Sequence, residues 1–130
     1  MNSVHASAPL PPPPASFNLA AHVLARAPEL AEKSALQILR PSGAERWSYA
    51  RLEAAVRGAG TGFLAAGLVP GDRVLLRLGN TPEFPVAYLG AIAAGLVPVP
   101  TSSQLTAAEI TKMAAQITPE IGRASCRERV

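Results

Sequence analysis

Residues 69–100 hold two short apolar runs on either side of a segment with helix start and stop signals. The sequence VPGD at 69–72 is typical of a tight turn, because proline presets φ, glycine accepts positive φ and aspartate bonds the local backbone. The runs at 73–78 and 96–100 are rich in Val and Leu, as strands buried on both faces are. Two such strands joined by a helix at 82–94 form a right-handed βαβ unit with parallel strands. The sequence therefore predicts an α/β fold built around this unit.

The central helix carries signals at both ends. Asn80 or Thr81 is a candidate N-cap, and Glu83 lies where the helix dipole favours a negative charge. Gly95 is expected to end the helix in a left-handed conformation. The prolines at positions 98 and 100 are expected to stop the second strand.

The other elements follow from the same periodicity rules. An amphipathic helix is expected at 18–27, with Leu19, Val23 and Leu24 on its buried face and Ala20 and Ala27 beside them. Strands at 34–39 and 45–48, separated by a Pro-Ser-Gly turn, predict a β-hairpin. The last expected helix, at 106–118, begins with a capping box, Thr106 to Glu109, and has an apolar face of Ile110, Met113, Ala114 and Ile117.

A long helix is expected at 48–66, capped by Ser48, and it contains the glycine cluster Gly58, Gly60 and Gly62. Its expected buried face consists of Leu52, Ala55, Val56, Ala59, Phe63 and Leu64. The glycines do not match a dinucleotide-binding loop, because the spacing fails and they follow helical periodicity instead of a strand end. Close approach of a neighbouring helix is the interpretation that the pattern favours.

The amino-acid sequence of the central stretch, PGDRVLLRLGNTPEFPVAYLGAIAAGLVPVP, resembles the N-terminal region of acyl-CoA synthetases in the adenylate-forming superfamily. WSYARL at 47–52 and LGAIAAGLVPVP at 89–100 resemble that family's first two core segments, and FNLAAHVL at 17–24 is similar to its benzoate-CoA ligase branch. The resemblance implies a partial N-terminal domain of that fold over 17–119. It also implies that the full-length protein joins a carboxylic acid to CoA with ATP and Mg²⁺.

The two ends of the chain differ from its middle. Residues 1–16 carry a run of four prolines, which favours polyproline II and predicts a disordered leader. Residues 120–130 contain three arginines and Cys126, the only cysteine, without a strand period. They resemble a vector-derived tail, and the prediction is that this tail is not native.

Composition argues against several function classes. The formal net charge of +3 is small and scattered, which does not predict nucleic-acid binding. A single cysteine fits a reducing cytoplasm. His5 and His22 have no further ligand at metal-binding spacing. The uncharged stretch at 84–108 is divided by prolines, so no membrane span is expected.

The family's phosphate loop, ribose-binding aspartate and C-terminal lysine are not found in this sequence. The only lysines are Lys33 and Lys112, and neither adjoins a glycine loop. Turn capping accounts for Asp72, and Ser102 and Ser103 have no base at a diagnostic spacing. The sequence therefore assigns no catalytic, cofactor-binding or metal-binding residue.

Two function classes follow. The first is an N-terminal fragment of an acyl-CoA ligase that is inactive alone and self-associates through exposed strand edges. The second is a stand-alone small α/β interaction or regulatory module, which would close its sheet within these residues.

Overall fold

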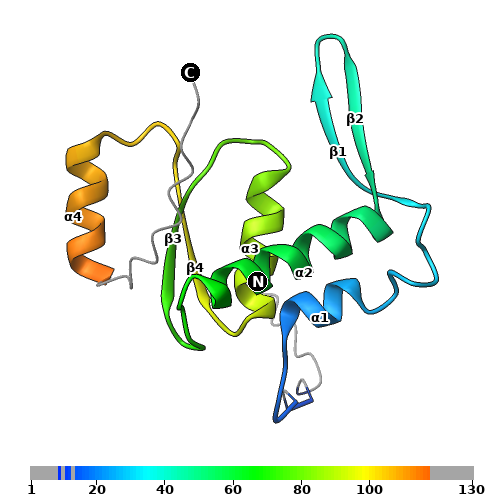
Figure 1. Ribbon diagram of the computed structural model, residues 1–130, viewed down its shortest axis with the longest axis horizontal. Coiled ribbons are helices and arrows are strands. Elements are labelled where there is room, and N and C mark those ends of the chain that lie inside the picture. Colours follow the sequence, from blue (N-terminus) through cyan, green and yellow to red (C-terminus); the bar gives the residue numbers. More distant parts are fainter. Residues whose placement is uncertain (1–8, 10, 13, 118–130) are drawn as a thin grey trace, which may run out of the picture.

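The structure is a computed structural model that describes residues 9, 11–12 and 14–117. The leader expected at 1–16 falls largely outside these residues, and the tail expected at 120–130 falls wholly outside them. Four helices and four strands follow one another along the described residues (Figure 1). In chain order they are α1 (Leu19–Leu24), β1 (Ser34–Arg40), β2 (Gly43–Ser48), α2 (Tyr49–Ala65), β3 (Arg73–Arg77), α3 (Glu83–Ala93), β4 (Val97–Thr101) and α4 (Ala107–Ile117).

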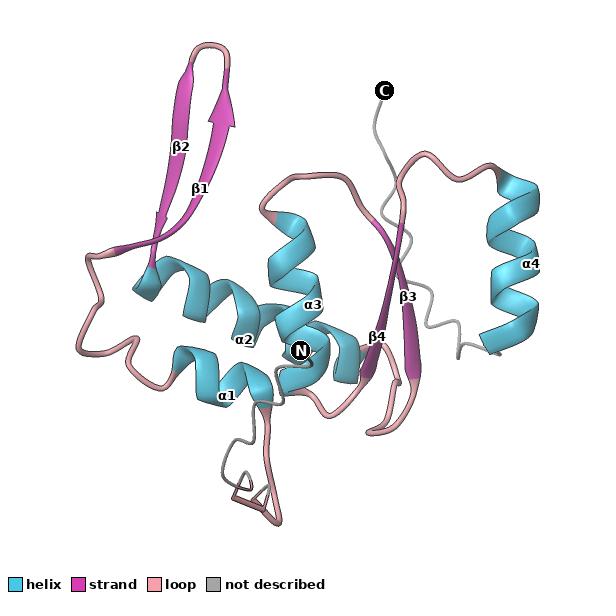
Figure 2. Cartoon of the chain, turned by 180° about the vertical axis from the view of Figure 1, so that it is seen from behind, coloured by secondary structure: helices cyan, strands magenta, loops and turns pink. Residues whose placement is uncertain are grey.

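The expected α/β fold, with a hairpin and a parallel βαβ unit flanked by helices, is confirmed. Strands β1 and β2 pair antiparallel, and β3 and β4 pair parallel with Arg73 opposite Val97 and Arg77 opposite Thr101. Helix α3 connects the two parallel strands. The hairpin extends away from the helices and the second sheet (Figure 2).

The turn before β3 forms as the sequence predicts. The backbone N–H of Val69 donates to the Asp72 carboxylate at 2.8 Å. Gly95 ends α3 with φ of 76°, a left-handed conformation that glycine adopts readily. The prediction that prolines stop the second strand is wrong, because Pro98 and Pro100 lie inside β4. A strand accommodates proline where the missing N–H would face an open edge.

The predicted side-chain cap of α3 is also wrong. Pro82 occupies the N-cap position and makes no side-chain hydrogen bond to the helix. The Thr81 side chain instead hydrogen-bonds Glu83, and this bond is the main cause of the lowered pKa of that carboxyl group. Since proline has no N–H and a preset φ, the first turn of α3 tolerates this arrangement.

Helices α2 and α3 cross where glycines meet. A Cβ added to Gly60 would lie 3.0 Å from the carbonyl oxygen of Gly90. A Cβ added to Gly90 would lie 2.7 Å from the Cβ of Ala59. The expected close helix approach is therefore confirmed at Gly60, whereas Gly58 and Gly62 have open space around the position of an added Cβ.

The buried face of α1 differs from the predicted one. Leu24 is buried as expected, and so are Ala20 and Ala27 beside it, whereas Leu19 and Val23 are 40% and 47% exposed. Small side chains let α1 approach α3, and Asn18 joins the two helices. Its Oδ1 accepts from the N–H of Ala21 at 3.1 Å, and its Nδ2 donates to the carbonyl of Ile92 at 2.8 Å.

The buried face of α2 is centred on Leu52, Val56 and Gly60. Leu64, which the periodicity placed on that face, is 47% exposed. The core lies in two clusters, and the first of them includes Leu52 and Val56. One joins Leu24 and Ala27 to α2, and the other joins Leu68, Ala91 and Leu96 beneath β3 and β4. The buried residues of both clusters are aliphatic, in keeping with the low aromatic content.

The hairpin is tied to the first turn of α2 by Trp47. Its indole N–H donates to Glu45 Oε1 at 2.8 Å, and the Arg51 guanidinium lies 3.8 Å from the centre of its ring. Trp47 thus lies half-buried against Arg51 at the start of α2, whose N-cap Ser48 accepts from the N–H of Arg51 at 3.3 Å. A cation over an indole face is a favourable electrostatic contact.

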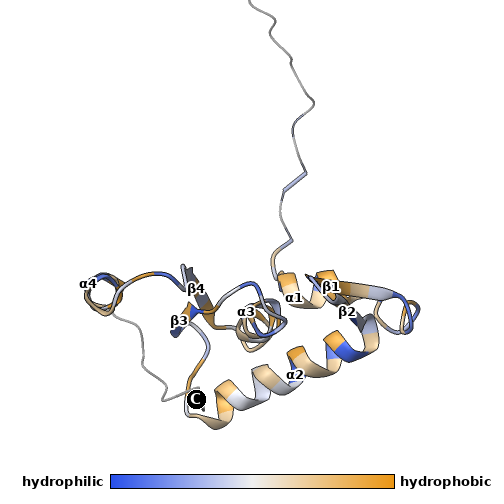
Figure 3. Cartoon of the chain, turned by 90° about the horizontal axis from the view of Figure 1, so that it is seen from above, coloured by the Kyte–Doolittle hydropathy of each residue, from blue (hydrophilic) through white to orange (hydrophobic). Residues whose placement is uncertain are grey.

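Helix α4 lies on the opposite side of the β3–β4 sheet from α3 (Figure 3). Its expected apolar face is half-buried, and no residue of the helix is fully buried. The capping box is confirmed. The N–H and hydroxyl of Thr106 both donate to Glu109 Oε2 at 2.8 Å, and the N–H of Glu109 donates back to the Thr106 hydroxyl at 3.3 Å.

The capping box predicts a pH dependence of α4. Hydrogen bonds from the Thr106 backbone and side chain lower the pKa of Glu109. A lowered pKa means that the stabilisation is complete above the ordinary glutamate pKa of about 4.3 and is lost as the pH falls through the lowered value. We expect the backbone amides of α4 to exchange faster with solvent as the pH falls below about 4, after correction for intrinsic exchange.

Glu109→Gln is the matched control, because glutamine keeps the acceptor and does not titrate. Its corrected exchange in α4 should not change over the same pH window. Corrected exchange in the original chain that stays constant down to about pH 2 would contradict this role for Glu109.

Candidate functional site

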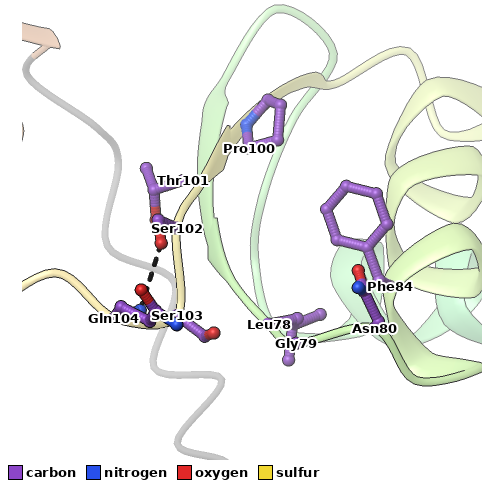
Figure 4. Close-up of a pocket in the computed structure, with 9 residues that line it drawn as sticks. All are labelled: Leu78, Gly79, Asn80, Phe84, Pro100, Thr101, Ser102, Ser103 and Gln104. Carbon is purple, nitrogen blue, oxygen red and sulfur yellow. Dashed lines mark hydrogen bonds between the residues drawn. The ribbon is translucent and has the colours of Figure 1, made fainter.

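A pocket of about 470 Å³ lies at the carboxyl ends of β3 and β4 (Figure 4). It is lined by Leu78, Gly79, Asn80, Phe84, Pro100, Thr101, Ser102, Ser103 and Gln104. The residues come from the loop after β3, the start of α3, the end of β4 and the loop that follows it. Ligands of open α/β sheets commonly bind at this end of parallel strands, which makes this pocket the first candidate site.

The loop after β4 is held by its own polar groups. The Thr101 hydroxyl donates to the carbonyl of Leu76 at 3.1 Å, and the Ser102 hydroxyl accepts from the N–H of Gln104 at 3.2 Å. Arg77 Nη2 donates to the carbonyl of Leu105 at 2.6 Å, outside the pocket lining. Figure 4 shows Phe84 and Asn80 on one side of the pocket and the Ser102–Gln104 loop on the other.

The lining contains hydroxyl and amide groups together with Phe84, and none of its nine residues is acidic or basic. Such a pocket can hold an uncharged polar group by hydrogen bonds or pack a planar group against the Phe84 ring. It supplies neither a general acid–base pair nor a cation for phosphate oxygens. Binding, and not proton or phosphoryl transfer, is therefore the chemistry that this lining supports.

A second pocket, of about 450 Å³, lies between α1, α2 and the end of α3. Its lining is mainly apolar and includes Leu24, Pro28 and Val56. The Glu53–Arg57 ion pair at 2.7 Å is also in the lining, and its four-residue spacing is a favourable one on a helix. The Arg57 side chain is 77% exposed, so the pair is screened by solvent and contributes little to stability.

The structure does not bring together the glycines and lysines that the sequence analysis considered as possible phosphate-binding residues. Gly58, Gly60 and Gly62 lie within α2, where helical hydrogen bonds engage the backbone N–H groups. Lys33 lies in the turn before β1, and its carbonyl accepts from the N–H of Tyr49 at 3.0 Å. Lys112 lies exposed on α4, on the far side of the sheet from α2. None of these residues lines either pocket.

The remaining candidates are equally separate. His22 is exposed on α1, with its ring centre 5.3 Å from that of Phe17. Ser102 and Ser103 do line the first pocket, but no titratable side chain does. His5 and Cys126 lie outside the described residues. Among the described residues, no three His, Cys, Asp or Glu side chains gather as metal ligands would.

Sequence reasoning missed the pocket residues Asn80, Phe84 and Gln104. Their only signal was position, because each follows or opens an element at the carboxyl edge of the predicted parallel strands.

None of the helices that the structure describes is both long and apolar enough to span a bilayer.

Comparison with known proteins decides the family. The family described as AMP-binding enzyme matches residues 24–121, which is most of the chain. The chain belongs to the AMP-binding enzyme family. The region that it matches is the N-terminal part of AMP-forming acyl-CoA synthetases.

Individual relatives of this AMP-binding chain agree with that assignment. It is 35% identical over 114 residues to 4-coumarate–CoA ligase-like 3 from Oryza sativa subsp. japonica, covering 87% of this chain and 19% of that ligase. It is 35% identical over 83 residues to 3-hydroxybenzoate–CoA ligase from Aromatoleum sp. (strain CIB), covering 64% of this chain and 16% of the ligase. The chain thus spans less than a fifth of these relatives.

A solved structure of a benzoate CoA ligase from Burkholderia xenovorans LB400 superposes with a TM-score of 0.71 at 32% identity, covering 80% of this chain and 20% of that one. The acetoacetyl-CoA synthetase from Streptomyces lividans gives a TM-score of 0.75 at 28% identity, covering 79% of this chain and 16% of that one. The AMP-binding chain therefore shares the N-terminal fold of these ligases.

Proposed function

We propose that this chain is the N-terminal portion of an AMP-forming carboxylate–CoA ligase. Such an enzyme converts a carboxylate, ATP and CoA to acyl-CoA, AMP and pyrophosphate. The observation that carries the proposal is the family match over 24–121, which coincides with the parallel βαβ unit and the helices packed on it. In the whole ligase the chain contributes part of the N-terminal domain.

The substrate class that the relatives favour is an aromatic carboxylic acid. Matching ligases are named for 3-hydroxybenzoate, for 4-hydroxybenzoate or benzoate, and for 4-coumarate. A benzoate CoA ligase is also among the similar solved structures. A relative named for long-chain fatty acids matches at 34% identity, so the aromatic proposal depends on the number of aryl relatives and on the resemblance at 17–24.

The 130-residue chain alone is proposed to be inactive. Forming an acyl adenylate places negative charge on pyrophosphate, which requires Mg²⁺, cationic side chains and converging N–H donors. Lys33 and Lys112 lie on separate elements, and the glycine-rich segment of α2 has its N–H groups engaged. Residues of this chain therefore serve as scaffold, and ATP, Mg²⁺, CoA and carboxylate are bound by other parts of the ligase.

The single cysteine of this chain fits a reducing cytoplasm.

The test is a pair of measurements on the purified chain. Pyrophosphate release with ATP, Mg²⁺, CoA and benzoate should stay at background, and calorimetric titration with Mg-ATP should show no saturable binding. An active benzoate CoA ligase is the assay control. Saturable binding of Mg-ATP by the folded chain would overturn the scaffold role.

The ligase assignment itself is tested by the coding sequence. Reading in frame beyond the codon for Pro119 in the native gene should reveal a Ser/Thr/Gly-rich loop ending in lysine. The protein expressed from that longer frame should form benzoyl-CoA with release of pyrophosphate. A stop codon directly after the fold, with a monomeric and soluble product, would instead favour a stand-alone module. Self-association of the 130-residue chain in sedimentation would favour the fragment, because its strand edges are open.

A further inference from the structure

The hairpin of β1 and β2 projects from the helices with little of its surface buried (Figure 2). No described residue of either strand is fully buried, and Leu39 is 81% exposed. Ala35, near the start of β1, packs against the core cluster that contains Leu52 and Val56. A two-stranded hairpin by itself is only marginally stable in water. Burial alone therefore does not fix the hairpin on α2.

A polar network centred on Glu45 supplies a further connection. Side chains alternate along a strand, so Glu45 and Trp47 project from the same face of the hairpin. Ile38 is the register partner of Glu45, and Arg40, two residues further along β1, lies on that face as well. The Glu45 carboxylate accepts from Trp47 Nε1 at 2.8 Å through Oε1 and from Arg40 Nη2 at 3.0 Å through Oε2. The two strands are thus joined through one carboxylate.

The network reaches α2 through Arg51. Its guanidinium carbon lies 3.8 Å from the centre of the Trp47 ring, and its Nη2 lies 4.0 Å from Glu45 Oε1. Isolated ion pairs at a protein surface contribute little to stability, but several charges that share one partner are an exception. The Glu45 network, which consists of Arg40, Glu45, Trp47 and Arg51, therefore connects β1, β2 and the first turn of α2.

Neighbouring charged groups have other surroundings. Arg46 alternates to the opposite face of the hairpin from Glu45. Glu83, at the start of α3, has its pKa lowered mainly by a hydrogen bond from the Thr81 side chain. Smaller effects on the pKa of Glu83 come from the network, since the charge of Glu45 raises it and the charge of Arg40 lowers it. Glu83 thus faces the network at longer range, and Glu45 is the carboxylate that the network shares.

We propose that the charge of Glu45 controls the position of the hairpin: the ionised carboxylate holds it on α2, and the protonated group releases it while the helical core stays folded. A neutral carboxyl group is a weaker acceptor for the Trp47 indole, and it leaves the charges of Arg40 and Arg51 unbalanced. Hydrogen bonds from Trp47 and Arg40 lower the pKa of Glu45. The hairpin is therefore fully held above the ordinary glutamate pKa of about 4.3 and is released as the pH falls through the lowered value.

Amide exchange with solvent, corrected for intrinsic exchange, tests the release. The amides of β1 and β2 should exchange at least about threefold faster at about pH 2.5 than at about pH 6, whereas the Val56 amide in α2 should stay protected. Trp47 is the only tryptophan, so its fluorescence should titrate with the same midpoint. Hairpin exchange that is equal at both pH values would overturn the proposal. Loss of protection at Val56 together with the hairpin would overturn it too, because the whole chain would then be unfolding.

Glu45→Gln and Glu53→Gln form a matched pair of variants. Glutamine has the shape of the carboxyl group and does not titrate, so the hairpin of Glu45→Gln should exchange at about pH 6 as the original chain does at about pH 2.5. Glu53 pairs with Arg57 on α2, outside the network, and Glu53→Gln should leave the titration intact. A hairpin titration that persists in Glu45→Gln would belong to another carboxyl group, such as Glu83, and would overturn the proposal.

Trp47→Phe tests the coupling between the indole and the carboxylate. Phenylalanine keeps an aromatic ring beside Arg51 and removes the N–H that is the main cause of the lowered pKa of Glu45. The midpoint of the hairpin transition, measured by amide exchange, should rise toward about 4.3. An unchanged midpoint would contradict the network as the cause of the release. None of these readouts uses ligase activity, so the proposal is independent of the proposed function.

Discussion

Gly90→Val is expected to lower the free energy of unfolding by about 3 kcal/mol, because the crossing of α2 and α3 has no room for a side chain. The nearest atoms to an added Cβ would be the Cβ of Ala59 at 2.7 Å, and the Gly60 nitrogen and Val56 carbonyl oxygen at 3.1 Å. Two of these are backbone atoms of α2, so relief requires the helices to separate. The measurement is the urea midpoint of the purified chain, followed by circular dichroism.

Gly58→Ala is the matched control for this prediction. It adds a methyl group at a helical glycine of α2 that has no heavy atom within 4 Å of the added Cβ. Replacing an exposed helical glycine with alanine stabilises by up to about 1 kcal/mol, so its midpoint should rise. Equal destabilisation by Gly90→Val and Gly58→Ala would mean that helix packing is not what the glycines provide.

Leu52→Ala is expected to cost about 2–5 kcal/mol, the usual range for removing a buried leucine side chain. Leu52 is 7% exposed and belongs to the cluster that joins α1 to α2, with Val86 and Leu89 of α3 packed against it. Because small domains are stable by only about 5–15 kcal/mol, this loss would remove much of the stability of the chain.

Leu39→Ala provides the comparison within the same chain. Leu39 lies on the projecting hairpin and is 81% exposed, so its truncation should change the free energy of unfolding by less than about 0.5 kcal/mol. Urea unfolding of both variants by tryptophan fluorescence gives the difference. A loss at Leu39 as large as that at Leu52 would show that the hairpin tip is buried in solution.

Most of the fold could be predicted from local sequence signals. Turn residues, caps and periodicity placed the four helices and four strands within about three residues of their observed ends. The parallel pairing of β3 and β4 followed from an interstrand segment long enough for a helix and too long for a hairpin turn. The candidate site was less accessible, because the pocket lining at Asn80, Phe84 and Gln104 carries no catalytic motif.

The sequence by itself determined the elements and their order, since turns, caps and alternation act over a few residues. The residues of the central stretch also indicated the family. Only the tertiary structure decided which apolar side chains are covered. Periodicity places Leu19 and Leu64 near helix stripes that pack, yet both are exposed, while Ala20 and Gly60 are buried where neighbouring helices approach closely. Burial depends on the distance and direction of a partner element, and those are properties of the packed chain. The prolines inside β4 depend on packing in the same way. A strand accommodates proline where the missing N–H would point away from the neighbouring strand, and the structure decides which positions point toward β3.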